Sequence, residues 1–496
     1  MSQRFFCALT VVFISLSCAC SGRMSPEEVV SRGLAGAEKL TGLDAKHEIP
    51  AKLIETRGEM IDLMWKLFRD DNPPGRYNVL RDVAERLGYY IDTPDSEQEL
   101  MELYVRGIAG VYDDKDNTAY VVSREARDEI REELRERGCR IWDYDESAWW
   151  EENVELFVMV HEMVHALQDQ HYDLDYYDEK YKQNSDAGYA YSAIVEGMAE
   201  FVETEYIYNQ WGRSTRDYLD HRHNLYRLLE RVREYEFAGE ELLEVGRDYC
   251  GEMMSYDNLM GFFKYTYGEA MAQEAAMEHG WKGVKELFNR YPLSTEQVVH
   301  PEKYFEEETL DLPTFVGYPD FYDVLPEDYA FLDSDSLGEF RIYLLIKDLE
   351  LEPRDAINVS EGWDGDRYYA FRNPDTDEVA FGWITVWDTV EDADEFFNFY
   401  RKMSKRKSLS AEISGGGDDL YYVESTWGEG SVERDGDRVV IVEGFEDREL
   451  MDEFRGMVMS AETFEATYEH DETLPERLVD RKENGEEEEE EEDEEE

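Results

Sequence analysis

Hydrophobic residues recur three or four positions apart through most of residues 46–305, which is the spacing of helices that bury one face. Beyond this region the pattern alternates between helical and β-rich runs: Leu337–Leu349, Arg367–Phe371, Val379–Trp387, Thr389–Met403, Leu420–Thr426 and Arg438–Glu443. These patterns predict an α+β fold, with a mainly helical first domain (46–305) and a smaller α+β domain (333–472). Residues 306–332 are rich in acidic residues, proline and aromatics, and we expect them to form a linker.

One segment of the helical region departs from the helical spacing. Within Arg106–Ser123, two β-rich runs flank the turn-forming residues DDKDN, which predicts a β-hairpin. Such a hairpin has an exposed strand edge, and extended peptides often bind by adding to an exposed edge. A second long helix is expected at about Ala190–Asn209, which contains the segment AIVEGMAEFVETEY.

The helix predicted after the hairpin carries the most specific motif of the chain, HEMVH. The apolar residues around it follow the spacing of a buried face: Leu156, Val160, Val164 and Leu167. His161 and His165 are four residues apart and can offer both imidazoles to one metal ion. Glu162 lies beside them, where a carboxylate can take a proton from a zinc-bound water. We hypothesise a zinc-binding helix; the alternative is two histidines that share a buried helix face.

Two histidines leave zinc short of its usual three protein ligands, and two residues compete for the third position. His171 completes the spacing H-E-x-x-H-x-x-G-x-x-H, except that Gln168 stands where the motif has glycine. Glu196, on the second long helix, is the other candidate. Glu200 would then share a helix face with Glu196 and could accept a hydrogen bond from a ligand imidazole.

The combination of HExxH on one helix and Glu on the next resembles the gluzincins. The chain more closely resembles poorly characterised secreted or lipid-anchored metallopeptidase-like proteins of bacteria and archaea, with the segments HEMVHALQDQH, AIVEGMA, STEQVVHPEKY and GWDGDRYYAF. The resemblance covers most of residues 100–400. It implies a zincin-like peptidase domain that binds Zn²⁺ through His161, His165 and Glu196, with Glu162 as general base. A peptide or protein would be the substrate. The gap before Glu196 is longer than in thermolysin, which implies inserted structure between the two helices.

A peptidase also needs a donor that stabilises the oxyanion of the transition state. His300, in STEQVVHPEKY, is our candidate, with Tyr291 or Tyr304 as the next choice. A loop or helix-capping role for His300 is the alternative.

The chain is strongly acidic, with 119 Asp and Glu against 51 Lys and Arg and a net charge of −68. The terminal run 486–496 carries only 11 of these charges, so the acidity extends over the whole chain. Such a surface repels phosphate backbones, which argues against nucleic acid as a partner. Residues 473–496 are expected to form a disordered acidic tail.

The N-terminus has the features of a secretion signal. A short apolar run after Arg4 leads into CACSG, which resembles a bacterial lipoprotein signal. We expect residues 1–20 to be the signal, with Cys20 as the lipid anchor, and residues 21–45 to be a short tether followed by a weak helix. Cys18 is the alternative anchor, and an ordinary cleaved signal is a further alternative. The protein would then be a lipoprotein of the cell envelope, at the outer membrane or cell surface, that touches the membrane only through its lipid.

Two cysteines lie further along the chain, Cys139 and Cys250. An envelope location permits a disulfide between them, and two buried free thiols are equally compatible with the sequence.

The alternative to a peptidase is a non-catalytic envelope lipoprotein. In that hypothesis the zinc helix is structural, and the C-terminal domain binds a partner through residues such as those of GWDGDRYY. Retention of Glu162 favours the enzyme, because a scaffold does not need that carboxylate. A third hypothesis is a metal buffer whose acidic tail holds Ca²⁺ loosely.

Overall fold

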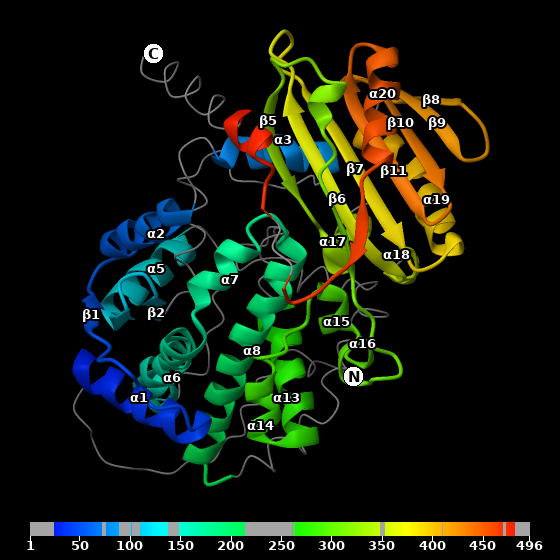
Figure 1. Ribbon diagram of the computed structural model, residues 1–496. Helices are drawn as coiled ribbons and strands as arrows, with labels where there is room; N and C mark the ends of the chain where they lie inside the picture. Colours follow the sequence, from blue (N-terminus) through cyan, green and yellow to red (C-terminus); the bar gives the residue numbers. More distant parts are fainter. Residues whose placement is uncertain are drawn as a thin grey trace, which may run out of the picture.

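The computed structural model describes residues 24–71, 76–88, 101, 110–136, 148–213, 260, 263–347, 353–408, 410–469 and 473–481. Helices dominate the N-terminal lobe, and a large sheet forms the C-terminal lobe (Figure 1). The mixed α+β class predicted from the sequence is therefore confirmed. The predicted signal peptide and four cysteines lie outside the described residues: Cys18, Cys20, Cys139 and Cys250.

The helical lobe contains the following elements in chain order: α1 (Pro26–Thr41), β1 (Ala51–Ile54), α2 (Arg57–Asp71), α3 (Arg76–Leu87), β2 (Gly110–Asp113), β3 (Thr118–Val122), α5 (Arg124–Glu136), α6 (Ala148–Tyr172), α7 (Leu174–Lys180), α8 (Ser185–Gln210), the π-helical turn η2 (Phe263–Tyr267), α13 (Gly268–His279), α14 (Trp281–Glu286), α15 (Thr295–Val299) and α16 (Glu302–Phe305). The predicted hairpin is confirmed as β2 and β3, which pair antiparallel. The sequence pattern missed β1, which pairs parallel with β3 and leaves β2 at the edge of a three-stranded sheet.

The core of this lobe is formed where α6 packs between α1 and α8. Both long helices are apolar around most of their circumference, because each is covered on several sides. Gly197 of α8 and Gly268 of α13 let these two helices approach closely: a Cβ at Gly197 would lie 2.0 Å from the backbone of Gly268. Because Gly197 and Gly268 have no side chains, α13 packs closely against α8 directly beside Glu196.

The C-terminal lobe contains β4 (Thr314–Val316), η3 (Phe321–Asp323), β5 (Ala330–Asp335), α17 (Gly338–Lys347), α18 (Pro353–Ser360), β6 (Trp363–Arg372), β7 (Val379–Trp387), α19 (Val390–Lys407), β8 (Glu412–Gly415), β9 (Leu420–Ser425), β10 (Gly428–Asp435), β11 (Arg438–Phe445), α20 (Arg448–Met459) and β12 (Thr463–Glu465). Seven strands form an antiparallel sheet in the order β5-β6-β7-β11-β10-β9-β8. The helix predicted at Thr389–Met403 is confirmed as α19, and Thr389 caps it by accepting from the Asp392 N–H. Helices α17 to α19 lie over one face of the sheet, and α20 over the other.

The two lobes share one hydrophobic core. Ala193 of α8 and Phe263 of η2 belong to the same buried cluster as Phe340 of α17 and Trp383 of β7. Phe263 and Phe340 are in direct ring contact, with centroids 4.5 Å apart. Helix α3 also docks on the C-terminal sheet, where Arg76 pairs with Asp333 at 2.8 Å. The two lobes are therefore in direct contact through a shared core, and are not connected only by a linker.

Parts of the segments predicted as tether, linker and tail are ordered in the structure. Residues 306–332, predicted as a linker, contain β4 and η3 and bury Phe321 and Leu325 in the core behind the sheet. The tether predicted at 21–45 contains α1, which packs on α6. The disordered tail predicted at 473–496 begins with a helix at 476–481 that buries Leu478; its remainder, 482–496, lies outside the described residues. In each segment a few apolar residues find a partner that the acidic local composition does not reveal.

The GWDGDRYYAF segment forms β6 and is mostly buried, so it does not offer the binding face that the scaffold hypothesis gave it. The Asp366 carboxylate accepts hydrogen bonds from the Gly338 N–H and from both Trp363 Nε1 and Trp383 Nε1, at 2.9–3.1 Å. Arg367 donates to the carbonyl oxygens of Val316 (2.6 Å) and Gln183 (2.8 Å). This segment therefore attaches the sheet to the loop that precedes α8.

The N-terminus of α8 is held by the C-terminal lobe. The Ser185 N–H donates to Asp335 Oδ1 at 2.6 Å, and the Asp186 N–H donates to the Ser336 carbonyl at 3.2 Å. Asp186 Oδ1 in turn accepts from the N–H and hydroxyl of Thr295 at 2.8 and 2.5 Å. Burial raises the pKa of Asp186 to about 7 despite these donors.

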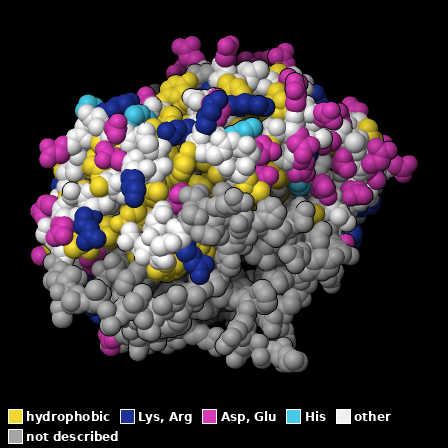
Figure 2. Space-filling view, turned by 90° about the horizontal axis from the view of Figure 1, so that it is seen from below, with side chains coloured by type: hydrophobic (Ala, Val, Ile, Leu, Met, Phe, Trp, Pro, Cys, Tyr) yellow, Lys and Arg dark blue, Asp and Glu magenta, His cyan; other side chains and the backbone are white. Residues whose placement is uncertain are grey.

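Acidic side chains gather at the right of the face seen in Figure 2, whereas Lys and Arg lie mainly over its left and upper parts. Among the described residues, no helix is both long and apolar enough to cross a bilayer.

Gly338 is the residue most sensitive to substitution at the junction between the lobes. Its φ is +81°, and a Cβ there would lie 1.8 Å from Asp186 Oδ1. We expect Gly338→Ala to lower the free energy of unfolding by about 3 kcal/mol or more, from backbone strain plus overpacking. Chemical denaturation at constant salt measures this loss.

Gly436→Ala is the matched control, because Gly436 has φ +65° but no heavy atom within 4 Å of its Cβ position. It should cost only about 1–2 kcal/mol, the strain of a left-handed backbone. Equal losses in the two variants would mean that Asp186 moves aside at no cost.

Candidate metal centre

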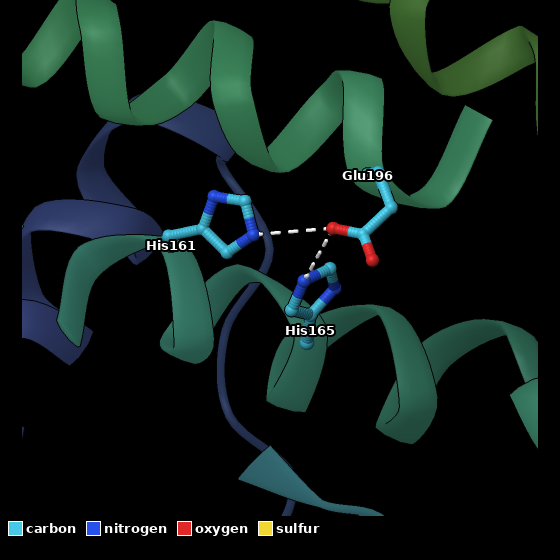
Figure 3. Close-up of side chains that lie close together, drawn as sticks. All are labelled: His161, His165 and Glu196. Atoms are coloured by element: carbon cyan, nitrogen blue, oxygen red, sulfur yellow. Dashed lines mark hydrogen bonds and ion pairs between the residues drawn. The ribbon is translucent and has the colours of Figure 1, made fainter. Parts of the chain in front are cut away.

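His161 and His165 lie one turn apart on α6 and face Glu196 on α8 (Figure 3). The Nε2 atoms of both histidines are 3.3 Å from the same carboxylate oxygen, Glu196 Oε2. The two imidazole rings lie 4.7 Å apart between centroids, in an edge-to-face arrangement. The structure thus brings together the three residues that the resemblance implied as ligands.

The geometry of the three donor atoms suits a zinc ion. Zinc with ligand distances of about 2.0–2.2 Å and tetrahedral angles separates its donor atoms by about 3.3–3.5 Å. The separations of 3.3 Å between Glu196 Oε2 and each Nε2 atom match this requirement. Two imidazoles and one carboxylate are also a donor set that leaves a fourth position open, as in catalytic zinc sites. The residues present therefore fit the ion that the motif predicts.

Electrostatic interactions within the cluster favour a protonated His161 beside an ionised Glu196. Burial alone would lower the pKa of His161, but the adjacent carboxylates of Glu196 and Glu203 raise this pKa well above its usual range. Likewise, burial opposes ionisation of Glu196, but His165 and His161 hold the pKa of its carboxyl well below the usual value. The cluster therefore keeps a negative oxygen between two nitrogen atoms, a position that would favour a cation.

A pair of carboxylates lies behind His161. Its Nδ1 atom is 3.5 Å from Glu203 Oε2 and 3.7 Å from Glu200 Oε1. Burial and the charge of Glu203 raise the pKa of Glu200 to about 8. The prediction that Glu200 supports a ligand imidazole is thus consistent with its position, and the sequence analysis missed Glu203, which lies closer.

Glu162 lies beside the two histidines of the cluster and forms a hydrogen bond with the three-stranded sheet. The backbone N–H of Tyr112, in the edge strand β2, donates to Glu162 Oε2 at 2.9 Å. Burial raises the pKa of the Glu162 carboxyl above its ordinary value, although His161 and His165 act in the opposite direction. A carboxylate with a raised pKa is a stronger base than an exposed glutamate.

Tyr265, on the π-helical turn η2, is a second residue that the sequence analysis missed. Its ring lies 6.1 Å from that of His161 between centroids, and its hydroxyl interacts with the Glu196 carboxylate. Desolvation and the charges of Glu196 and Glu162 raise the pKa of Tyr265, so the hydroxyl stays protonated. π-Helical turns are frequent at functional sites, but such a turn leaves no recognisable signal in the sequence.

The other sequence candidates lie elsewhere. His171 Nε2, at the end of α6, is 2.9 Å from the carbonyl oxygen of Asp44 and does not lie at the cluster. His300 Nε2 lies 3.1 Å from Glu339 of α17, at the junction between the lobes, which contradicts its expected place near the metal. Tyr291 and Tyr304 pack in an aromatic cluster with Tyr468 and Arg290. Spacing alone could not exclude these residues, because it does not say where a loop returns.

Another acidic group within the described residues could be mistaken for a metal site. Glu296, Asp311 and Asp388 converge, but the ammonium of Lys303 lies among them at 2.6–3.3 Å. A lysine thus already supplies the cation there.

Comparison with known proteins gives one match. Residues 328–455 match a family model described as a domain of unknown function (DUF8575). These residues run from just before β5 into α20, so the matched region is the seven-stranded sheet with its helices and does not include the histidine cluster. Neither the curated proteins nor the solved structures contain a match to the chain.

The metal centre can be tested by the zinc content of single variants. We expect about one zinc per chain in the wild type, with His165→Ala and Glu196→Ala each weakening zinc affinity by more than about 100-fold, the upper range for residues that merely support a ligand. Chelator competition followed by elemental analysis measures both quantities.

His171→Ala is the control, because this histidine lies on the same helix but contacts Asp44 instead of the cluster. It should leave zinc affinity unchanged. Loss of zinc from this variant, with zinc kept in Glu196→Ala, would reverse the assignment of the third ligand.

Proposed function

We propose that this protein is a zinc-dependent metallopeptidase of zincin-like architecture. The observation that carries the proposal is the convergence of His161, His165 and Glu196 next to the buried carboxylate of Glu162. Three donors with an open position and an adjacent base are the arrangement required for metal-assisted hydrolysis of an amide.

The position of β2 supports a peptide as the substrate. This strand is at the edge of the three-stranded sheet and packs against α6, and its Tyr112 contacts Glu162 directly. A peptide that pairs with a strand edge is held extended, which presents its backbone carbonyls at regular intervals. The edge strand and the base are therefore close enough to act on one bound chain.

The residues of the chain divide the chemistry between them. Bound zinc would polarise the scissile carbonyl and make a coordinated water more acidic. Glu162 accepts the proton of the attacking water and later delivers it to the leaving amine. The Tyr112 N–H keeps one oxygen of Glu162 in place, which leaves the other oxygen to handle the proton.

Tyr265 replaces His300 in our proposal as the donor that stabilises the oxyanion. Its hydroxyl already points at Glu196, and it stays protonated because its pKa is raised. His300, by contrast, is engaged with Glu339. A hydroxyl within the ligand cluster can shift from the carboxylate to a developing negative charge on the substrate.

The proposal includes attachment to the cell envelope through a lipid on Cys20, as the N-terminal sequence implies. The first described helix, α1, begins at Pro26, so only a few residues would separate the lipid from the folded lobe. The overall negative charge argues against nucleic acid as a further partner.

The alternative of a non-catalytic scaffold has less support. It requires the C-terminal domain to bind a partner, but the aromatic residues of GWDGDRYY are buried, and so are Asp366 and Arg367, which contact the rest of the chain.

Replacement of Glu162 by Gln tests the mechanism. Gln keeps the shape and can still accept from the Tyr112 N–H, but it cannot take a proton. We expect a loss of turnover of about 10²–10⁴-fold with unchanged zinc content, measured by mass spectrometry on a mixture of unstructured peptides. Undiminished cleavage by this variant would sink the proposed mechanism.

Tyr265→Phe tests the oxyanion donor, with His300→Ala as the comparison. Loss of one donor typically lowers kcat by about 10²–10³-fold, and we expect KM to change little. His300→Ala should retain kcat, because the imidazole contacts Glu339 outside the cluster. The reverse pattern would return the role to His300.

A further inference from the structure

The two ligand histidines have different partners behind them. His161 Nδ1 faces the carboxylates of Glu203 and Glu200, whereas His165 Nδ1 lies 2.9 Å from the side-chain amide of Gln168. Gln168 is fully buried and occupies the position where the spacing of the third-ligand motif has glycine. A buried amide at that position requires a reason, because burial without hydrogen bonds is costly.

Both ends of the Gln168 amide are used. Its Nε2 donates to the backbone carbonyl of Val195 at 2.9 Å, and its Oε1 contacts His165 Nδ1. A carbonyl oxygen can only accept, so the NH₂ group must face Val195 and the oxygen must face the histidine. His165 Nδ1 must then carry the proton, which leaves Nε2 with its lone pair toward Glu196.

We propose that Gln168 is the positioning residue that selects the metal-binding tautomer of His165 and couples the two ligand helices. Its amide links His165 on α6 to Val195 on α8, and Val195 is the residue directly before Glu196. One side chain thus sets the orientation of one ligand and the backbone next to another. The inference deepens the proposed metallopeptidase site and rests on it.

The neutral amide also suits the charge around the cluster. Glu162, Glu196, Glu200 and Glu203 already lie within or beside it, and burial raises the pKa of Glu162 and of Glu200. A carboxylate behind His165 would add a further negative charge to a site that must desolvate each one. Glutamine supplies the acceptor without that charge.

The test compares Gln168→Met, Gln168→Glu and Gln170→Met, as full chains at constant salt. Met matches the volume of Gln but has no strong acceptor. Glu keeps the acceptor oxygen but introduces a negative charge that must be desolvated. Gln170 is the control: it lies on the same helix, and its side chain accepts from the Lys46 and His47 N–H groups instead of from a ligand.

We expect Gln168→Met to weaken zinc affinity by about 10–100-fold and Gln170→Met to leave it unchanged, as measured by chelator competition. Gln168→Glu should bind zinc more tightly than Gln168→Met. A residue that only packs would give the opposite order, because Met fills the space without a buried charge. Equal affinities of Gln168→Met and the wild type would overturn the inference while leaving the metal centre intact.

A second readout does not depend on zinc binding. In the metal-free wild type, ¹⁵N spectra of histidine-labelled protein should show His165 as the Nδ1–H tautomer, and Gln168→Met should gain the Nε2–H form. An Nε2–H tautomer in the wild type would refute the assignment. If the wild type binds no zinc, the proposed function fails, and the tautomer measurement still decides the role of Gln168.

Discussion

The whole structure depends on the burial of α8 along two of its sides. One side packs with α6 in the core of the helical lobe, where Ile194 and Met198 lie, and the other side contributes Ala190 and Ala193 to the core under the C-terminal sheet. Its first turn is held by Asp335 of the C-terminal lobe and by Thr295 of α15. Because Glu196 lies at the middle of this helix, its position relative to the histidines depends on both cores at once.

The chemistry of the cluster follows from crowding carboxylates in a low-dielectric interior. Four glutamates lie within or beside two histidines, and burial raises the pKa of two of them, Glu162 and Glu200. Glu196, held between both imidazoles, has a lowered pKa. A divalent cation would relieve this repulsion at the point where the three donor atoms converge, which is the basis of the proposed metal site.

Much of the fold was readable from the sequence where a single element buries a regular face. Val379–Trp387 was predicted with its observed bounds as β7, and the helical run predicted from Thr389 is α19, whose first turn Thr389 caps. Strands β5, β8 and β10 were missed, and so was the order within acidic segments such as 306–332. Those segments are stabilised by contacts with residues distant in the sequence, and local composition does not indicate such contacts.

For the candidate site, the sequence by itself determined the pair His161 and His165 with Glu162, because a helix of 3.6 residues per turn places them on one side. It also left Glu196 and His171 as open alternatives for the third ligand. The packing of the helices shows that Glu196, and not His171, faces the two histidines. It also places His300 outside the cluster and brings Tyr265, Glu203 and Gln168 to it. The physical reason is that helix periodicity acts within one element, whereas the meeting of α6, α8 and η2 depends on packing between elements that no local pattern encodes.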